Sequence, residues 1–343
     1  MRKLLKIQQK LLPDLLEVLA KRYRILQYIR LMQPIGRRSL SSSLNISERV
    51  LRSEVTFLKE QGLVHIASAG MYVTDEGETL FEELELVMKE LLGLQELEAK
   101  LEQQLGVKEV LIVPGNSDEF SWVKKELGRA CIAKMKEALK PRDVVAVMGG
   151  TTLAAVAEMM MPDSRMANVT FVPARGGLGE KVENQANTIS ATMAGKAGAQ
   201  YKLLHVPDQL SEEAYASLIA EPGVRTILES IKSACMVIHG IGEASTMALR
   251  RGSDRDFLEK IERENAVAEA FGYYFDKTGH VIHKQRTIGL QLDELGEEKL
   301  VISVAGGASK AEAISAYMKY RPSDVLITDE GAAKRLLALH DAK

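Results

Sequence analysis

Four stretches of the chain share one pattern, in which an apolar run is followed by a glycine-rich corner and then by the start of a helix. Parallel strands end at the same edge of a sheet, so such corners gather there. Glycine lets an anion approach the partly positive N–H groups of a helix start. The pattern therefore predicts an α/β domain with a phosphate pocket at one sheet edge. The four runs with their corners are Val144–Met148 before Gly149–Thr152, Val169–Val172 before Ala174–Gly179, Met236–Ile238 before Gly240–Gly242, and Leu300–Val304 before Gly306–Lys310.

The part of the chain after Val107 alternates apolar runs with helical patterns. This alternation predicts a doubly wound, Rossmann-like α/β domain over residues 106–343. The stretch from Lys277 to Leu300 is irregular, with one candidate antiparallel strand at Val281–His283. The expected strands are Glu109–Val113, Val144–Met148, Val169–Val172, Tyr201–Val206, Cys235–Ile238, Leu300–Val304 and Val325–Thr328.

The corners and nearby cations supply candidate groups for binding a phosphate. Gly149–Thr152 offers backbone amides and two hydroxyls, although a tight turn with a threonine cap would have the same sequence. Arg175 would present a two-pronged guanidinium, and Arg250 and Lys310 add positive charge; a loop arginine on the surface is the alternative. Gly306–Lys310 lacks the spacing of a Walker A loop, so nucleotide hydrolysis is not expected.

The charge of the chain is divided unevenly along its length. Residues 1–75 contain 13 Lys and Arg against 6 Asp and Glu, whereas the remaining residues contain 32 against 41. A basic N-terminal part on an acidic body indicates a polyanionic partner for the N-terminal part alone. No apolar run is long enough to span a bilayer, and no membrane partner is expected. The sequence predicts a cytoplasmic protein.

The order of elements in residues 1–75 predicts a winged helix-turn-helix domain that binds double-stranded DNA. A helix over 14–32, a short segment over 38–44, a helix over 48–61 and a hairpin over 63–74 follow one another. The helix over 48–61 is expected to bury Val50, Leu51, Val55 and Leu58. Its opposite face carries the candidate DNA contacts Arg49, Arg52, Ser53 and Thr56, while Arg37 and Arg38 precede it where a helix would cross the DNA backbone. An ordinary solvated helix is the alternative.

A long helical pattern over 76–105 connects the two domains. Leucine and valine recur there in alternating steps of four and three, and Glu98 interrupts the series. This heptad pattern predicts a helical linker that pairs two chains, giving a homodimer or homotetramer. A single amphipathic helix packed on the body is the alternative.

The glycine-rich corners resemble those of the SorC family of bacterial sugar-responsive transcriptional regulators. The resemblance is carried by Gly149–Thr152, Pro173–Gly177 and Gly306–Lys310, and it covers nearly the whole chain. It implies an effector domain similar to sugar-phosphate isomerases and deaminases. The stretch Gly36–Ser41 departs from the T-Q-x-E-I-A-like opening typical of the family, which favours a regulator of glycolytic genes over regulators of pentose or polyol genes.

The resemblance also implies a repressor that is induced by fructose 1,6-bisphosphate and needs no cofactor. Separately, His205, His239 and His280 lack metal-ligand spacing, so structural roles and no metal site are expected for them, and no nucleophile elbow indicates catalytic residues. One phosphate would bind Gly149, Thr151, Thr152 and Lys310. The effector's other phosphate would bind Arg175, Gly177, Gly179 and Arg250, and its sugar hydroxyls would meet Gln185 and Glu269. An enzyme of the isomerase or deaminase type, with Glu269 or Asp118 as the base, is the alternative. A DNA-binding scaffold with a vestigial pocket is a third.

Overall fold

The computed structural model of the protein describes residues 11–177, 181–207 and 211–341. The chain divides into two compact units, Met1–Gln95 and Glu96–Lys343, which take the names DNA-binding unit and effector unit from the functions that the sequence predicts for them. Across the described residues, no helix combines the length and the apolar character needed to cross a membrane.

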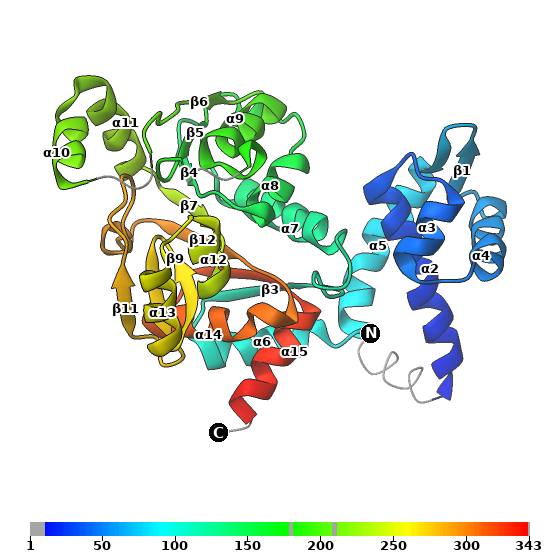
Figure 1. Cartoon of the computed structure of the whole chain (residues 1–343). Coiled ribbons are helices and arrows are strands. Elements are labelled where there is room, and N and C mark those ends of the chain that lie inside the picture. The colour runs from blue at the N-terminus through cyan, green and yellow to red at the C-terminus, as the bar shows by residue number, and fades with distance from the viewer. Residues whose placement is uncertain (1–10, 178–180, 208–210, 342–343) are drawn as a thin grey trace. The chain divides into compact units, whose positions relative to one another are not determined.

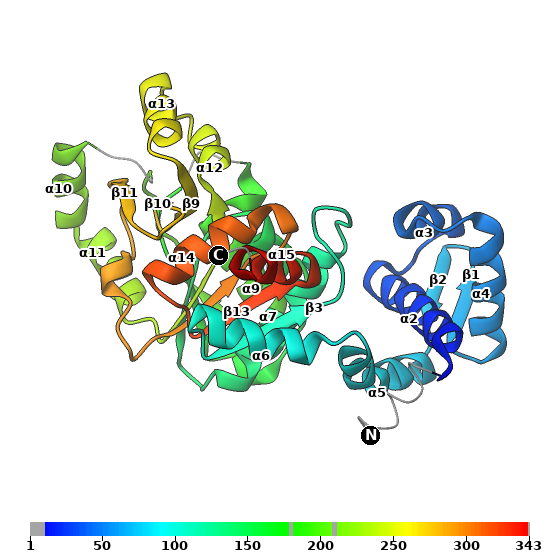
Figure 2. The ribbon, with the colours of Figure 1, turned by 90° about the horizontal axis from the view of Figure 1, so that it is seen from below.

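The DNA-binding unit has the expected winged helix-turn-helix order (Figures 1 and 2). Helices α3 and α4 pack on each other and on α2, and the hairpin β1–β2 packs against α4 and α2. Ile29, Leu40, Leu51 and Met71 are buried at the centre of this arrangement. The elements are α2 (Pro13–Met32), α3 (Arg37–Leu44), α4 (Glu48–Glu60), β1 (Val64–Ala67), β2 (Gly70–Val73) and α5 (Asp75–Leu91).

The tight turn between α3 and α4 is set by local side-chain chemistry. Asn45 ends α3 in the left-handed conformation with φ 52°, which asparagine tolerates better than most residues. The Ser41 hydroxyl donates to the carbonyl of Ile46 at 2.6 Å. Ser47 then begins α4 as its N-cap, accepting a hydrogen bond from the backbone N–H of Val50.

The expectation that Val50 is buried is wrong. Its side chain is 41% exposed, whereas Leu51, Val55 and Leu58 are buried as expected. The inner face of α4 includes Glu54 instead, whose carboxylate binds Lys21 at 2.5 Å and Arg22 at 2.8 Å. A paired carboxylate can occupy a buried position, and an apolar count along the helix does not reveal such a pair.

The expected continuous helix over the linker is also wrong, because it is divided into α5 and α6 (Leu94–Leu105). Gly93 separates the two helices with φ 68°, a conformation that an L side chain rarely adopts. Leu101 and Leu105 of the expected pairing face are buried within the single chain. For α6 the structure therefore favours the alternative of a helix packed on its own domain.

The effector unit is built on a parallel sheet of seven strands, which confirms the expected doubly wound α/β architecture. Its order places sequence-distant strands side by side, with β7 between β12 and β4. The strands in spatial order are β3 (Glu109–Val113), β13 (Val325–Asp329), β12 (Leu300–Val304), β7 (Met236–His239), β4 (Val144–Val147), β5 (Thr170–Pro173) and β6 (Gln200–Tyr201). The strand expected over Tyr201–Val206 is reduced to β6, which pairs with β5 at the edge of the sheet.

Helices cover both faces of this sheet (Figure 1). α7, α8 and α9 pack on one another along one face, and α14 and α15 lie on the other. The main helices of the unit after α6 are α7 (Val123–Ala138), α8 (Thr151–Glu158), α9 (Ala186–Ala197), α10 (Glu212–Ala220), α11 (Pro222–Lys232), α12 (Ala244–Arg250), α13 (Arg255–Arg263), α14 (Ala311–Tyr320) and α15 (Glu330–Asp341).

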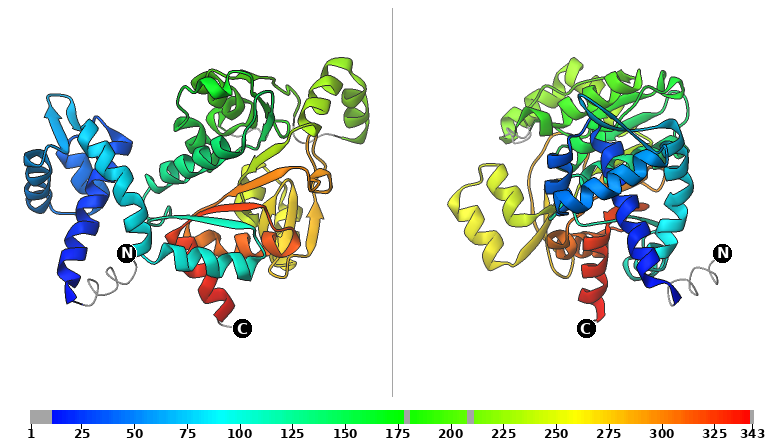
Figure 3. Two further views of the ribbon diagram at one scale, coloured as in Figure 1. Left: turned by 180° about the vertical axis from the view of Figure 1, so that it is seen from behind. Right: turned by 90° about the vertical axis from the view of Figure 1, so that its right-hand side faces the viewer.

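The effector unit also contains a second, antiparallel sheet of four strands, of which the sequence pattern indicates only the edge strand at Val281–His283. Its order is β11 (Val281–Lys284), β10 (Tyr273–Asp276), β9 (Ala266–Ala270) and β8 (Gly242–Glu243). The orange helix α14 packs against the yellow strands β9 and β10 (Figure 3). Because β8 follows directly from the corner after β7, this small sheet stands next to the edge where the phosphate pocket was expected.

Candidate functional site

The corner between β4 and α8 presents a helix N-terminus to the site. Gly150 is the N-cap, and no side chain of the described residues caps the helix. The Gly150 N–H donates to the carbonyl of Asn184 at 2.8 Å, and a Cβ on Gly149 would lie 2.7 Å from that same oxygen. Only glycine allows this approach. The N–H groups at the start of α8 and the hydroxyls of Thr151 and Thr152 are thus placed for an anion.

The corner after β12 carries Lys310 at the end of the short 3-10 helix η4 (Ala308–Lys310). Gly307 has φ 102° and accommodates the Asp118 carboxylate, which would be 2.4 Å from a Cβ at this position. Asp118 accepts hydrogen bonds from the backbone N–H and the hydroxyl of Ser309 at 2.8 and 3.0 Å. The buried Asp329 accepts from the Gly307 N–H at 2.7 Å. These carboxylates fix the corner that holds Lys310.

Arg175 is buried at the end of β5, where the backbone of a neighbouring loop holds it. Arg175 pairs with Gly289 in an isolated antiparallel β-bridge. The backbone N–H of Gly176 donates to the carbonyl of Ile288 at 3.0 Å. A Cβ on Gly289 would lie 2.4 Å from the carbonyl oxygen of Ala174, so this contact requires glycine. The arginine is therefore positioned by both of its flanking segments.

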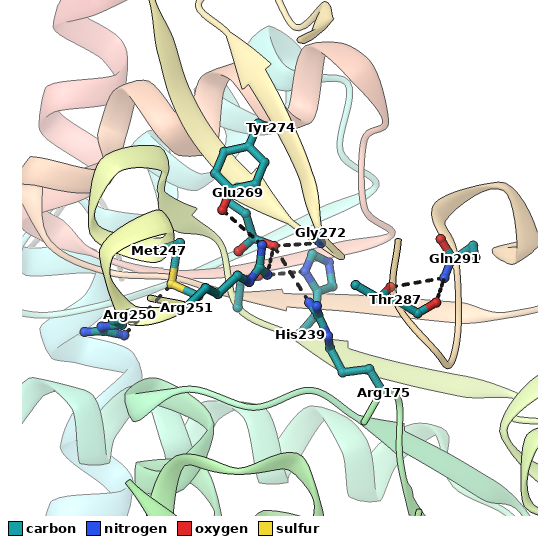
Figure 4. Close-up of polar contacts among 11 residues, drawn as sticks. Arg175, His239, Met247, Arg250, Arg251, Glu269, Gly272, Tyr274, Thr287 and Gln291 are labelled. Atoms are coloured by element: carbon teal, nitrogen blue, oxygen red, sulfur yellow. Dashed lines mark hydrogen bonds and ion pairs between the residues drawn. The ribbon is translucent and has the colours of Figure 1, made fainter. Parts of the chain in front are cut away.

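A buried ion pair between α12 and β9 forms one wall of the site (Figure 4). The Glu269 carboxylate accepts from Arg251 at 2.6 Å and from the Gly272 N–H at 2.7 Å, and Arg175 lies 3.8 Å away. Burial alone would raise the pKa of Glu269, but Arg251 and Arg175 outweigh it and hold this pKa below its usual value. Arg251 also donates to the hydroxyl of Tyr274 at 3.1 Å. Glu269 thus partly neutralises two arginines.

A neutral histidine supports the floor of the site. His239 is fully buried, and burial lowers its pKa to about 4. Its Nδ1 lies 2.9 Å from the carbonyl of Gly240, and its Nε2 lies 2.7 Å from the Ser303 hydroxyl. Its ring packs against Phe271 with centroids 4.8 Å apart. Structural roles were expected for the histidines, and these contacts give His239 one.

The two corners, Arg175 and the α12–β9 wall enclose one cavity of about 550 Å³ that opens to solvent. Seven of the ten predicted effector-binding residues line it together with Gly240, Gly242 and Phe271. Gly177 and Gln185 lie beside each other next to the Arg175 loop but outside the lining, and Gly179 is outside the described residues. The seven are Gly149, Thr151, Thr152, Arg175, Arg250, Glu269 and Lys310.

Positive charge dominates the polar part of this cavity. Removal from bulk water, together with Lys124 and Arg250, lowers the pKa of Lys310 to about 8, against the opposing effect of Asp118 and Asp329. Burial and, to a smaller extent, the neighbouring cations thus both disfavour the protonated amine. An anionic ligand would relieve this repulsion, so the site is electrostatically suited to phosphate.

The two carboxylates considered as catalytic bases are already engaged. Both oxygens of Asp118 bind Ser309, and Asp118 does not line the cavity. Glu269 lines it, but its carboxylate is held by Arg251 and the Gly272 N–H. A general base must reach a substrate proton in its unprotonated form. Asp118 thus has no access to a ligand in the cavity, and Glu269 is held there as the counter-ion of Arg251.

The second candidate site is the outer face of the helix-turn-helix. All six predicted DNA-binding residues are exposed, and no ion pair holds any of them among the described residues. Arg22 and Arg30 of the same unit differ, because Arg22 binds Glu54 and lies 3.6 Å from the Phe57 ring centroid, and Arg30 binds Glu78 and Glu82. Arg22 and Arg30 thus have structural roles, whereas the exposed arginines of this face can reach DNA. The six exposed residues are Arg37, Arg38, Arg49, Arg52, Ser53 and Thr56.

Comparisons with known proteins identify both domains. Residues 18–88 match the family model described as "CggR N-terminal DNA binding domain", and residues 89–338 match "Putative sugar-binding domain". A SorC-family regulator structure from Enterococcus faecalis is similar with a TM-score of 0.67 and 44% identity, covering 71% of this chain and 99% of that one. The chain belongs to the SorC family of transcriptional regulators.

Curated relatives extend this similarity over nearly the full length. The protein called "Central glycolytic genes regulator" is 60% identical in Priestia megaterium, covering 98% of this chain and 99% of the relative. The protein of the same name in Bacillus subtilis is 58% identical over the same shares. This SorC-family chain is therefore a DNA-binding transcriptional regulator with a sugar-binding domain, and not an enzyme. The enzyme alternative is rejected.

Proposed function

We propose that this SorC-family regulator represses central glycolytic genes in the cytoplasm and is induced by fructose 1,6-bisphosphate. The convergence of Arg175, Arg250, Lys310 and the N-terminus of α8 on one cavity carries the proposal. A ligand with more than one phosphate would use several of these groups at once. The name of the two relatives supports glycolytic genes as the target.

In this proposal the Arg49–Thr56 face of α4 enters the major groove and Arg37 and Arg38 bind the DNA backbone. These side chains are exposed and carry positive charge, which suits phosphate contacts and makes binding dependent on salt. Operators read by a helix-turn-helix commonly consist of two half-sites, so the regulator would act as a homodimer or homotetramer.

In the effector unit, Gly177, Gly179 and Gln185 would complete the effector site, next to Arg175.

Induction follows if the effector binds one arrangement of the protein more tightly than the arrangement that binds operator. A coupling free energy of about 1–3 kcal/mol would weaken operator binding roughly 5- to 150-fold. Occupancy of the cavity alone would change nothing, so the response must be measured on DNA.

The test is fluorescence anisotropy of the protein on a labelled fragment of the promoter that it controls. Fructose 1,6-bisphosphate is expected to weaken operator binding, whereas fructose 6-phosphate and glucose 6-phosphate should do so less. Arg175→Ala should abolish the response and retain operator binding, while Arg335→Ala, at an exposed arginine of α15, should behave as wild type. A response that survives Arg175→Ala would contradict the proposed site. Equal responses to the bisphosphate and the monophosphates would contradict the proposed effector.

A further inference from the structure

Helix α6 is attached to the parallel sheet by two carboxylates on one face. Glu98 accepts a hydrogen bond from the backbone N–H of Ile112 at 2.8 Å, and Glu102 accepts one from the N–H of Val110 at 3.1 Å. The two glutamates are one helical turn apart, and the two amides are one strand repeat apart. These are the outward N–H groups of β3, an edge strand whose other side pairs with β13. α6 therefore takes the place of a further strand.

The strand that α6 holds leads directly into the effector site. After β3, the N–H of Ser117 donates to Asp329 at 2.8 Å, and Asp329 also accepts from Gly307 at 2.7 Å. Asn116 accepts from the N–H of Ala308 at 3.3 Å, next to the hydrogen bonds between Asp118 and Ser309. Hydrogen bonds thus connect the loop after β3 to the Lys310 corner, both directly and through Asp329.

A negatively charged ligand would change the electrostatic interactions at the Lys310 corner. Asp118 and Asp329 both raise the pKa of Lys310 by their proximity, in opposition to burial and the nearby cations. A phosphate on Lys310 competes with these carboxylates for the same ammonium group and repels them. The electrostatic interactions of Asp118 and Asp329, which hold the loop after β3, therefore differ between the empty and the occupied cavity.

We infer that Glu98 and Glu102 are positioning residues that transmit effector occupancy from the Lys310 corner through β3 to the linker helix α6. The inference rests on the proposed function and adds its route of regulation. α6 follows α5 of the DNA-binding unit in the chain, so a change in how β3 holds α6 acts on the connection to that unit. Side chains in contact with neither ligand nor DNA would then control the response.

The first test compares full-length wild type with the double variant Glu98→Leu/Glu102→Leu. The variant removes both acceptors and should retain fructose 1,6-bisphosphate binding in calorimetry and operator binding without effector. Its effector-induced change in operator affinity should be reduced about 2- to 30-fold, the range for residues that carry coupling. Glu98→Gln/Glu102→Gln keeps an oxygen acceptor at each position and should restore the response. Gln103→Leu, on the exposed side of α6, is the matched control and should respond as wild type.

The second test is hydrogen–deuterium exchange of the full chain, which remains informative if the leucine variant is poorly folded. Fructose 1,6-bisphosphate should change exchange in the wild-type peptide containing Val110 and Ile112, and Glu98→Ala should diminish that change. An operator response that is unchanged in the leucine variant, or no change in exchange at β3, would overturn the inference while leaving the proposed function standing. If wild type itself shows no response to the bisphosphate on DNA, both fail together.

Discussion

Arg251 and Glu269 form an ion pair of 2.6 Å in which both side chains are almost completely buried, at 1% and 5% exposure. Arg250, the preceding residue, is exposed and points away from this pair toward Met247 (Figure 4). Successive residues of a helix differ in direction by roughly 100°. The end of α12 thus directs Arg251 into the protein and Arg250 toward the cavity.

Arg251→Ala should destabilise the effector unit by about 3–5 kcal/mol, because it leaves the Glu269 carboxylate buried with fewer partners. The measurement is urea unfolding followed by the fluorescence of Trp122, the single tryptophan, which lies in this unit. Arg255→Ala is the control, since Arg255 binds Glu259 at 2.8 Å on the exposed surface. Surface pairs contribute little. Equal effects of the two substitutions would contradict a structural role for Arg251.

The buried histidine predicts a specific dependence of stability on pH. Burial lowers the pKa of His239 to about 4 from an ordinary value of 6.5. Between these values the unfolded chain binds a proton that the folded chain does not, so stability falls as the pH decreases from 6.5 to 4. The loss is on the order of 3 kcal/mol across the window. His239→Gln should flatten this part of the profile, whereas His65→Gln, exposed on β1, should not.

Effector affinity should also depend on pH, through Lys310. Its pKa of about 8 means that the amine loses its proton as the pH rises from 7 to 9. A bound phosphate favours the protonated form, so affinity for fructose 1,6-bisphosphate should fall across this range. Phosphate groups titrate near pH 6 and contribute little here. Calorimetry at pH 7 and pH 9 measures the effect, and Lys310→Arg, which stays protonated, should remove it. A constant affinity in wild type would exclude Lys310 from the phosphate site.

The parts of the site that the sequence predicted are those built from consecutive residues. Gly149, Thr151 and Lys310 lie in corners between one strand and one helix, and such corners are visible as short local patterns. Arg175 was found in the same way. Because all parallel strands end at one edge, the sequence order alone was enough to bring these residues to one cavity.

The parts that were missed depend on pairing between distant segments. The register of β9 with β10 places Glu269 opposite Tyr274, and only this pairing shows that Arg251 bridges the two. Short strands of two to five residues, such as Gly242–Glu243, leave no periodic signal. Gly93, where the linker divides, is a helix-breaking residue in the sequence. The heptad pattern on both sides of it nevertheless predicted one continuous helix. Glu98 interrupts that pattern because it faces the strand β3.

The DNA-binding face gives the last prediction, a contrast between two arginines of one unit. Arg52 is exposed on α4, so Arg52→Ala should weaken operator binding by about 1–3 kcal/mol if it reads a base, or uniformly across sequences if it binds a phosphate. In the second case the dependence of log affinity on log salt should decrease in slope by about 1. Arg22→Ala should instead lower thermal stability, because Arg22 holds Glu54 and covers Phe57. Operator titrations at several salt concentrations, paired with thermal unfolding of each variant, separate the two roles. Unchanged operator affinity in Arg52→Ala would remove this residue from the DNA-binding face.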